Sequence, residues 1–167
     1  MRKTQKLTAI SLLVAQGLVL HIFERMLPVP FIAPGAKLGL TNIITLIGLY
    51  IFSFKEVFLI IVLRIIMATL LGGTLSNFLY SIAGGILSFL AMYVMKKLGK
   101  DNVSIIGISI VGAVFHNIGQ VIVAGLVIEN AMIVTYLPIL LVAAIGTGFF
   151  VGLTAKYLLP FIKRITL

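Results

Sequence analysis

The chain has 167 residues, of which 61% are apolar and only 10% are charged. Soluble domains carry about 25% charged residues, so this composition excludes an ordinary soluble enzyme and indicates a single membrane domain. The sequence contains no cysteine, which excludes disulfides, thiolate metal sites and a cysteine nucleophile. Its formal charge of +9 raises the question of nucleic acid, which the positions of the basic residues answer.

Apolar runs divide the chain into six candidate spans. A helix that crosses the ~30 Å hydrocarbon layer needs about 20 mostly apolar residues, and charges, glycines and prolines separate six runs of roughly this kind. We therefore predict an all-α integral membrane domain over residues 1–167. The first run could instead be a signal peptide, but no small-residue cleavage site follows it, which favours a retained helix. The predicted spans are residues 7–23, 38–54, 57–71, 78–95, 103–128 and 133–159.

The basic residues fall mainly on one side of these spans. When the loops are assigned alternately to two sides, ten basic residues lie on one side and two on the other. This asymmetry predicts a multi-pass plasma-membrane protein with both termini in the cytoplasm, and contact with anionic lipid rather than nucleic acid. The ten are Arg2, Lys3, Lys6, Lys55, Lys96, Lys97, Lys100, Lys156, Lys163 and Arg164, and the two are Arg25 and Lys37.

Glycine, proline and small residues mark two irregular segments and one packing face. The proline-rich residues 27–35 and the uncharged residues 72–77 predict non-helical or kinked backbone at the outer membrane surface. Ala144, Gly148 and Gly152 recur every four residues, which favours close helix packing over a ligand role. Ser11 and Ala15 have the same interpretation.

The fifth span carries the strongest polar signal. Gly112, His116 and Gln120 follow an i, i+4, i+8 spacing and share one face, which Asn117 adjoins. Such groups at membrane depth must find partners inside the bundle. They form either an interhelical hydrogen-bond cluster that fixes packing or the polar wall of a substrate cavity, and their number favours the cavity.

Other polar residues are candidates at the outer side. Lys37 follows a Pro-Gly turn at the start of the second span, where it either binds an anionic group or anchors the helix at the interface. Asn42 lies one turn deeper. Arg64, the one charge well inside a span, either extends to the cytoplasmic surface or lines a cavity.

The end of the first span has a simpler interpretation. His21, Glu24 and Arg25 lie together there, and a solvated helix end explains them best.

Catalytic templates are absent from the sequence. Asp101 is the single aspartate and the three glutamates are isolated, so no acidic pair can hold the Mg²⁺ ions of diphosphate chemistry. His21 and His116 lie on different spans without a neighbouring carboxylate, so no metal site is predicted. No nucleotide-binding motif occurs, so ATP-driven work would need another subunit. We assign no catalytic residue and expect a non-enzymatic protein.

Three segments together resemble a known family. Residues 34–42 (PGAKLGLTN), residues 77–88 (NFLYSIAGGILS) and residues 116–120 (HNIGQ) resemble the Gx transporter family, which also carries the label heptaprenyl diphosphate synthase component I. That family is similar to the S components of energy-coupling-factor (ECF) vitamin transporters. The resemblance implies six helices, both termini inside, an outward-facing cavity and ECF-type energising subunits as partners. Members are also associated with flavin-based electron transfer and quinone biosynthesis.

Two departures from these relatives matter for function. S components carry an Ala-x-x-x-Ala docking patch on the first helix, whereas Ala9 is followed four residues later by Leu13. The acidic pairs that prenyl transfer requires are also missing, so a synthase role would be that of an accessory subunit.

The sequence therefore favours an S-component-like transporter subunit. Its substrate would be a small, partly apolar molecule, with or without an anionic group, that enters from the outer side. The first alternative is an accessory membrane subunit of isoprenoid or quinone synthesis, which predicts a lipid-sized groove open sideways. The second is a component of an electron-transfer complex, which would need a non-covalent flavin or quinone because no intrinsic cofactor is expected. The candidate substrate-binding residues are Lys37, Asn42, Arg64, His116, Asn117 and Gln120.

Overall fold

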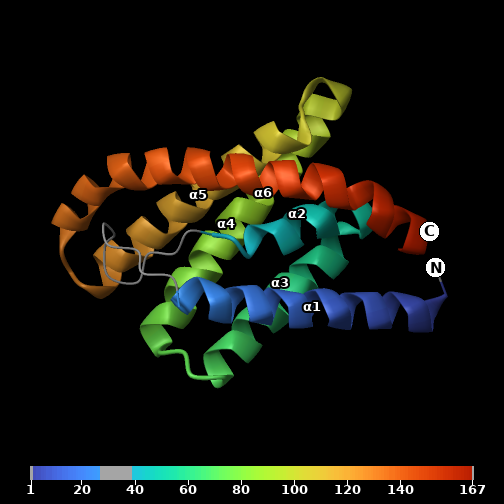
Figure 1. The fold of residues 1–167 in the computed structure, drawn as a ribbon. Helices are drawn as coiled ribbons and strands as arrows, with labels where there is room; N and C mark the ends of the chain where they lie inside the picture. The colour runs from blue at the N-terminus through green and yellow to red at the C-terminus, as the bar shows by residue number, and fades with distance from the viewer. Residues whose placement is uncertain (1, 27–38, 167) are drawn as a thin grey trace.

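The computed structural model describes residues 2–26 and 39–166, and every regular element in these ranges is helical (Figure 1). An all-helical fold is thus confirmed for this part of the chain. The elements are α1 (Lys3–Met26), α2 (Asn42–Ile51), α3 (Phe54–Leu70), α4 (Leu75–Gly99), the 3₁₀ turn η1 (Lys100–Asn102), α5 (Ile105–Val127), the 3₁₀ turn η2 (Ala131–Tyr136) and α6 (Leu137–Thr166).

The helices alternate in direction, so both termini lie at one end of the bundle, which we call the terminal end (Figure 1). At this end Lys96 of α4 donates a hydrogen bond to the Leu49 carbonyl near the end of α2. At the opposite, distal end, Arg25 Nη1 donates to the Gly72 carbonyl oxygen at 3.2 Å, joining the end of α1 to the turn after α3. The arrangement agrees with the predicted alternation of loops, while the side that faces the cytoplasm stays a prediction.

Four helices are long and apolar enough to cross a membrane. They are α1, α4, α5 and the continuous stretch of η2 and α6. Four of the six predicted spans thus coincide with helices that could cross a membrane, whereas α3 with 17 residues and α2 with 10 are shorter. At 1.5 Å per residue α2 is about 15 Å long, half the thickness of the hydrocarbon layer.

Local backbone chemistry explains why α2 is shorter than residues 38–54. Gly39 has φ +79°, a conformation that favours glycine, and the chain turns over residues 40 and 41 before the helix begins. At the other end the Ser53 N–H donates to Glu56 at 2.9 Å, which starts α3 with only two residues between it and the end of α2.

The short helix α2 lies at the centre of the bundle and packs against each of the other five α-helices. It is apolar nearly all round, as expected for a helix with no exposed face. Its side chains Ile44, Leu46 and Ile47 belong to a core that extends to α1, α3, α4, α5 and α6. Both polar residues that begin this region, Thr41 and Asn42, are therefore buried as well.

Small residues bring α5 and α6 into close contact, as predicted. A Cβ added to Gly148 would lie 2.7 Å from the Ile110 Cα, and one added to Gly152 would lie 2.7 Å from the Ile106 Cα. Ala144 is fully buried. Ser11 and Ala15 differ, since both are exposed on α1.

The predicted irregular segment at residues 72–77 is confirmed in its first half. Gly72 has φ +109°, and α4 begins at Leu75, with the Thr74 side chain accepting the Asn77 N–H at 3.2 Å. The second predicted irregular segment, residues 27–35, lies outside the described residues.

Candidate functional site

The polar face of α5 points into the bundle. His116 and Gln120 are 4% and 3% exposed, as the helical spacing predicts. The neighbouring helix α4 approaches this face very closely, since a Cβ added to Gly84 would lie 2.9 Å from the His116 carbonyl oxygen and 3.0 Å from the Gln120 Cγ. The absence of a side chain at Gly84 thus allows α4 to pack directly on the polar residues.

Asn42, the first residue of α2, lies beside His116. A Cβ added to Gly39 would be 3.0 Å from the Asn42 Nδ2 and 3.6 Å from the His116 Cδ2, so the three residues meet at one point. Asn42 is 3% exposed, and neither amide atom has a hydrogen-bond partner in the part of the chain that the structure describes. A buried amide without partners costs roughly 1–3 kcal/mol, which makes Asn42 the clearest candidate for contact with a bound molecule.

The end of α1 contributes two buried polar residues, contrary to prediction. His21 and Glu24 are 8% and 4% exposed, so the expected solvated helix end is wrong for both, and only Arg25 is exposed. They continue the inward stripe of α1, whose positions are separated by three or four residues along one helical face. The stripe is Ile10, Leu13, Gly17, His21 and Glu24, and this spacing is the sequence signal that would have found them.

Glu24 joins α1 to the start of α2. Its carboxylate accepts the N–H of Gly39 and, at 3.4 Å, the N–H of Leu40. Two backbone donors stabilise a buried carboxylate, which otherwise pays a large desolvation cost. Glu24 therefore fixes the turn that places Asn42.

Arg64 of α3 is enclosed in the bundle and does not extend to its surface. It is 4% exposed and interacts electrostatically with Glu24. Gly17 makes room for it, because a Cβ there would lie 2.5 Å from the Arg64 Cδ. Of the two open interpretations, extension to the surface is thus excluded by burial, and Arg64 balances the charge of Glu24 within the bundle.

A small cavity lies next to Arg64, between α1, α3 and α4. Its volume is about 10 Å³, which is room for a single water molecule. Polar groups from all three helices face it, so a water there would find several partners. The lining residues are His21, Arg64, Ile65, Ala68, Thr69, Gly73, Asn77 and Ser81.

The buried polar residues described above form what we call the polar cluster: His21, Glu24, Asn42, Arg64, His116 and Gln120. Asn117 is not part of it. It is 3% exposed, and its Nδ2 donates to the Leu140 carbonyl oxygen of α6 at 2.8 Å. This contact fits the packing interpretation of the α5 polar residues, whereas the Asn42 amide has no such partner among the described residues. Lys37, the remaining predicted site residue, lies outside the described residues.

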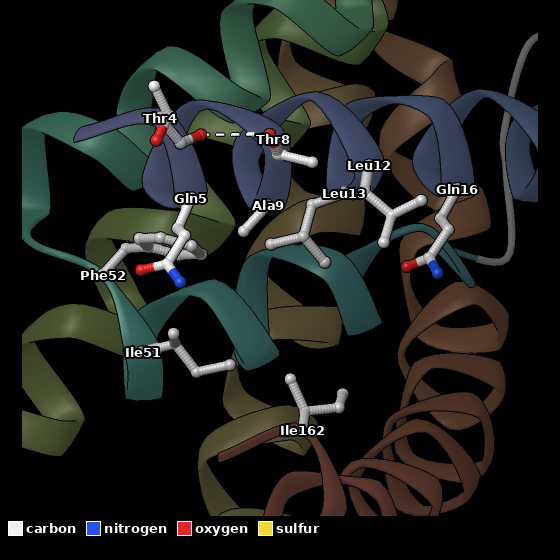
Figure 2. A pocket seen from close by; sticks show the side chains of 10 residues that line it. All are labelled: Thr4, Gln5, Thr8, Ala9, Leu12, Leu13, Gln16, Ile51, Phe52 and Ile162. Carbon is white, nitrogen blue, oxygen red and sulfur yellow. Dashed lines mark hydrogen bonds between the residues drawn. The ribbon is translucent and has the colours of Figure 1, made fainter. Parts of the chain in front are cut away.

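The bundle has a second, much larger cavity, which the sequence did not predict. It is a groove of about 560 Å³ between α1, the end of α2 and the end of α6, which we call the α1–α6 groove (Figure 2). It is open to the surroundings, since Leu12 on its wall is 57% exposed. The lining residues are Thr4, Gln5, Thr8, Ala9, Leu12, Leu13, Gln16, Ile51, Phe52 and Ile162.

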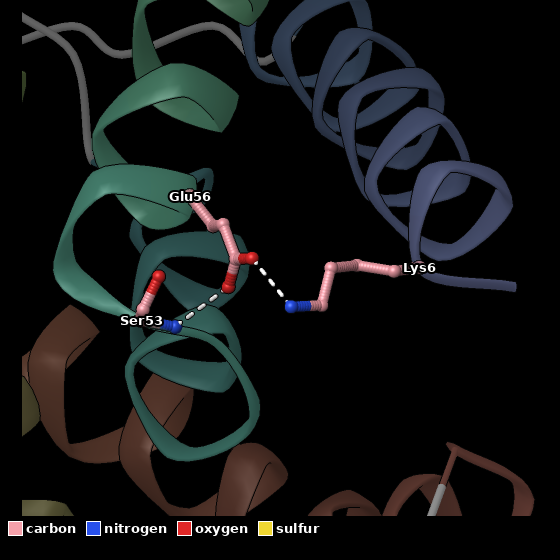
Figure 3. Close-up of polar contacts among 3 residues, drawn as sticks. All are labelled: Lys6, Ser53 and Glu56. Atoms are coloured by element: carbon pink, nitrogen blue, oxygen red, sulfur yellow. Dashed lines mark hydrogen bonds and ion pairs between the residues drawn. The ribbon is translucent and has the colours of Figure 1, made fainter. Parts of the chain in front are cut away.

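The terminal end of the bundle carries the one salt bridge among the described side chains. Lys6 Nζ lies 2.7 Å from the Glu56 Oε1, and the other carboxylate oxygen accepts the Ser53 N–H (Figure 3). The hydrogen bond from Lys6 and then that from Ser53 lower the pKa of Glu56 to about 2. This pair ties the start of α1 to the start of α3 and leaves the other basic residues at this end without described acidic partners.

The described residues contain no group of three or more metal-ligating side chains, and their polar cluster combines one carboxylate, one guanidinium, imidazoles and amides. Such a set is suited to hydrogen-bonding a molecule within an apolar bundle. The fold and this cluster define an all-helical protein with membrane-crossing helices and an internal polar site.

Residues 13–158 match the family described as heptaprenyl diphosphate synthase component I, and the chain belongs to this family. Comparison with curated proteins and with solved structures gives no match.

Proposed function

We propose that this chain is a membrane-embedded substrate-binding subunit of a transporter, similar in role to ECF S components. Its ligand is a small, partly apolar molecule that enters from the distal end. Asn42, His116 and Gln120 orient it by hydrogen bonds, while Arg64 and Lys37 favour an anionic group where the ligand has one.

The observation that carries this proposal is that the side-chain amide of Asn42 has no hydrogen-bond partner among the described residues. Both of its polar atoms are buried without partners among the described residues, next to His116. A cluster that served packing alone would be expected to pair this amide within the bundle, as Asn117 pairs with Leu140. A ligand carbonyl or N–H group would satisfy it.

The charges of the polar cluster already compensate each other in the absence of a ligand. Arg64 and Glu24 are both buried and interact electrostatically, so the bundle tolerates these charges before a ligand arrives. Glu24 also holds the Gly39 turn, which keeps Asn42 in place. Little reorganisation is then needed on binding, which favours affinity.

Native mass spectrometry of the gently purified protein tests this proposal. We expect a small molecule to accompany the wild type and to be lost in Asn42→Ala and His116→Ala. Ser109→Ala is the matched control, since Ser109 is also a buried polar residue of α5 but is not part of the cluster. Retention of the molecule by all three variants, or a wild type that carries none, would contradict the proposal.

A second candidate function is an accessory membrane subunit of polyprenyl diphosphate synthesis. The family description supports it, and so does the α1–α6 groove, because this function requires a lipid-sized groove open sideways. The chain would then present a lipidic substrate or product to a separate catalytic subunit. Co-purification of a soluble prenyl synthase, together with a bound prenyl diphosphate, would favour this function over transport.

A transporter role also needs an energising partner. Ser11 and Ala15 form a small-residue pair that is exposed on α1, and such pairs allow close approach of another transmembrane helix. We propose this pair as the docking surface for a membrane coupling subunit. Ser11→Leu together with Ala15→Leu would abolish co-purification of that subunit, while ligand retention would be unchanged.

A further inference from the structure

We propose that the α1–α6 groove binds an anionic phospholipid of the membrane leaflet at the terminal end. One acyl chain lies in the groove, and the phosphate lies between Lys96 and Lys163. This site is distinct from the polar cluster and does not depend on the transport proposal.

Two lysines from different helices face the same aromatic ring, that of Tyr50. Lys96 Nζ of α4 lies 4.3 Å from the centroid of the Tyr50 ring, and Lys163 Nζ of α6 lies 5.9 Å from it. The two positive charges repel each other, and neither has an acidic partner within the described side chains. An anion between them would relieve this repulsion.

Neighbouring residues of α2 and α6 contribute to the groove and to this contact of the lysines with Tyr50. The lining residues Ile51 and Ile162 are the chain neighbours of Tyr50 and Lys163. Figure 2 shows Ile51 and Ile162 facing the groove from below, opposite the α1 side chains. A molecule whose anionic head lies at the lysines can therefore extend its apolar tail into the groove.

The depth of the groove matches one leaflet. Its wall on α1 extends from Thr4 to Gln16, which is about 18 Å along the helix. One leaflet contributes about half of the ~30 Å hydrocarbon layer. The polar side chains Thr4 and Gln5 lie at the terminal end of this wall, where the glycerol and phosphate of a lipid would be. Ala9 and Leu13 lie deeper.

Charge at the terminal end selects an anionic rather than a zwitterionic lipid. Lys163 is exposed, and the described acidic side chain at this end, Glu56, is already paired with Lys6. A basic residue that contacts the headgroup of an anionic lipid strengthens its binding about fivefold. The combination of paired lysines and an adjoining apolar groove therefore fits a phospholipid with a net negative headgroup.

The test uses the delipidated full chain in detergent, titrated with dioleoyl-phosphatidylglycerol or dioleoyl-phosphatidylcholine and observed by native mass spectrometry. We expect one phosphatidylglycerol to bind in preference to phosphatidylcholine. Lys163→Gln would weaken it about fivefold, and Ala9→Phe, which fills the groove, would abolish it. Lys97→Gln is the matched charge control, and Leu7→Phe, at a position 64% exposed, is the matched control for added bulk on α1.

Equal binding of the two lipids, or the same affinity in Lys163→Gln as in Lys97→Gln, would overturn the proposal. Lys163→Gln is the decisive variant because Lys96 also holds the Leu49 carbonyl and its loss could unfold the end of α2. Displacement of phosphatidylglycerol by an equimolar prenyl diphosphate would also overturn it, and would assign the groove to the second candidate function.

Discussion

Gly84 of α4 lies directly against His116 of α5, and a Cβ at Gly84 would be 2.9 Å from the His116 carbonyl oxygen. Backbone cannot move aside as a flexible side chain can, so this contact sets the distance between the two helices. The position of His116 in the polar cluster therefore depends on a glycine one helix away.

Gly84→Ala is expected to destabilise the protein by about 1–3 kcal/mol, because the added methyl group overpacks the α4–α5 contact. The measurement is thermal unfolding in detergent. Gly146→Ala is the matched control, since nothing lies within 4 Å of a Cβ there. Alanine favours a helix by up to about 1 kcal/mol over glycine, so the control should be neutral or stabilising. Equal effects of the two substitutions would show that the α4–α5 contact is not tight.

Glu24 and Arg64 are expected to be energetically coupled. Glu24→Gln leaves the buried Arg64 without its compensating charge, and Arg64→Met leaves Glu24 in the same state, so each single variant should be strongly destabilised. The double variant should be less destabilised than the sum of the two, with a coupling free energy of about 1–3 kcal/mol. Unfolding of the four proteins in a double-mutant cycle measures it, and strict additivity would refute the coupling.

Asn117→Ala is expected to affect stability but not ligand binding. It removes the 2.8 Å hydrogen bond to the Leu140 carbonyl oxygen, and interhelical hydrogen bonds in membranes contribute about 0.6 kcal/mol on average. A small decrease in unfolding temperature with unchanged ligand retention is the predicted result. Loss of the ligand without loss of stability would instead place Asn117 in the binding site.

The Lys6–Glu56 pair predicts a defined pH dependence. The pKa of Glu56 is lowered from an ordinary value of 4.5 to about 2, so the unfolded chain takes up its proton first as the pH falls. The stabilisation is complete above about pH 4.5 and is lost as the pH falls towards about 2. Because the side chains are 43% and 22% exposed, the effect should be no more than about 1 kcal/mol.

Thermal unfolding of the wild type and Glu56→Gln across this pH range measures the pair. The wild type should be more stable at neutral pH, and the difference should vanish near pH 2. A difference that persists unchanged at that pH would mean that the carboxylate charge is not its cause.

Hydropathy predicted the helical fold but not all of its boundaries. The helices α4, α5 and α6 were predicted from the sequence, because the length of an apolar run is enough to identify a helix of this kind. The short α2 was overestimated, because the positive φ of Gly39 and the early start of α3 depend on local hydrogen bonds rather than on hydropathy. Its central, fully surrounded position depends on how five other helices pack.

The candidate site was predicted in part for similar reasons. His116 and Gln120 follow a helical repeat that the sequence displays, and their inward orientation is confirmed. Glu24 was taken as a solvated helix end, since its burial depends on the Gly39 turn that packs against it. The α1–α6 groove is a space between helices far apart in sequence, and no periodicity along one helix indicates it.

The most direct test of ligand binding at the polar cluster is the affinity of the molecule that elutes with the wild type, measured by calorimetry for the wild type and Asn42→Ala. Loss of a buried hydrogen bond of about 1–3 kcal/mol predicts binding weakened by about 5- to 150-fold in the variant. An unchanged Kd in Asn42→Ala, with both proteins folded, would contradict a binding role for this cluster.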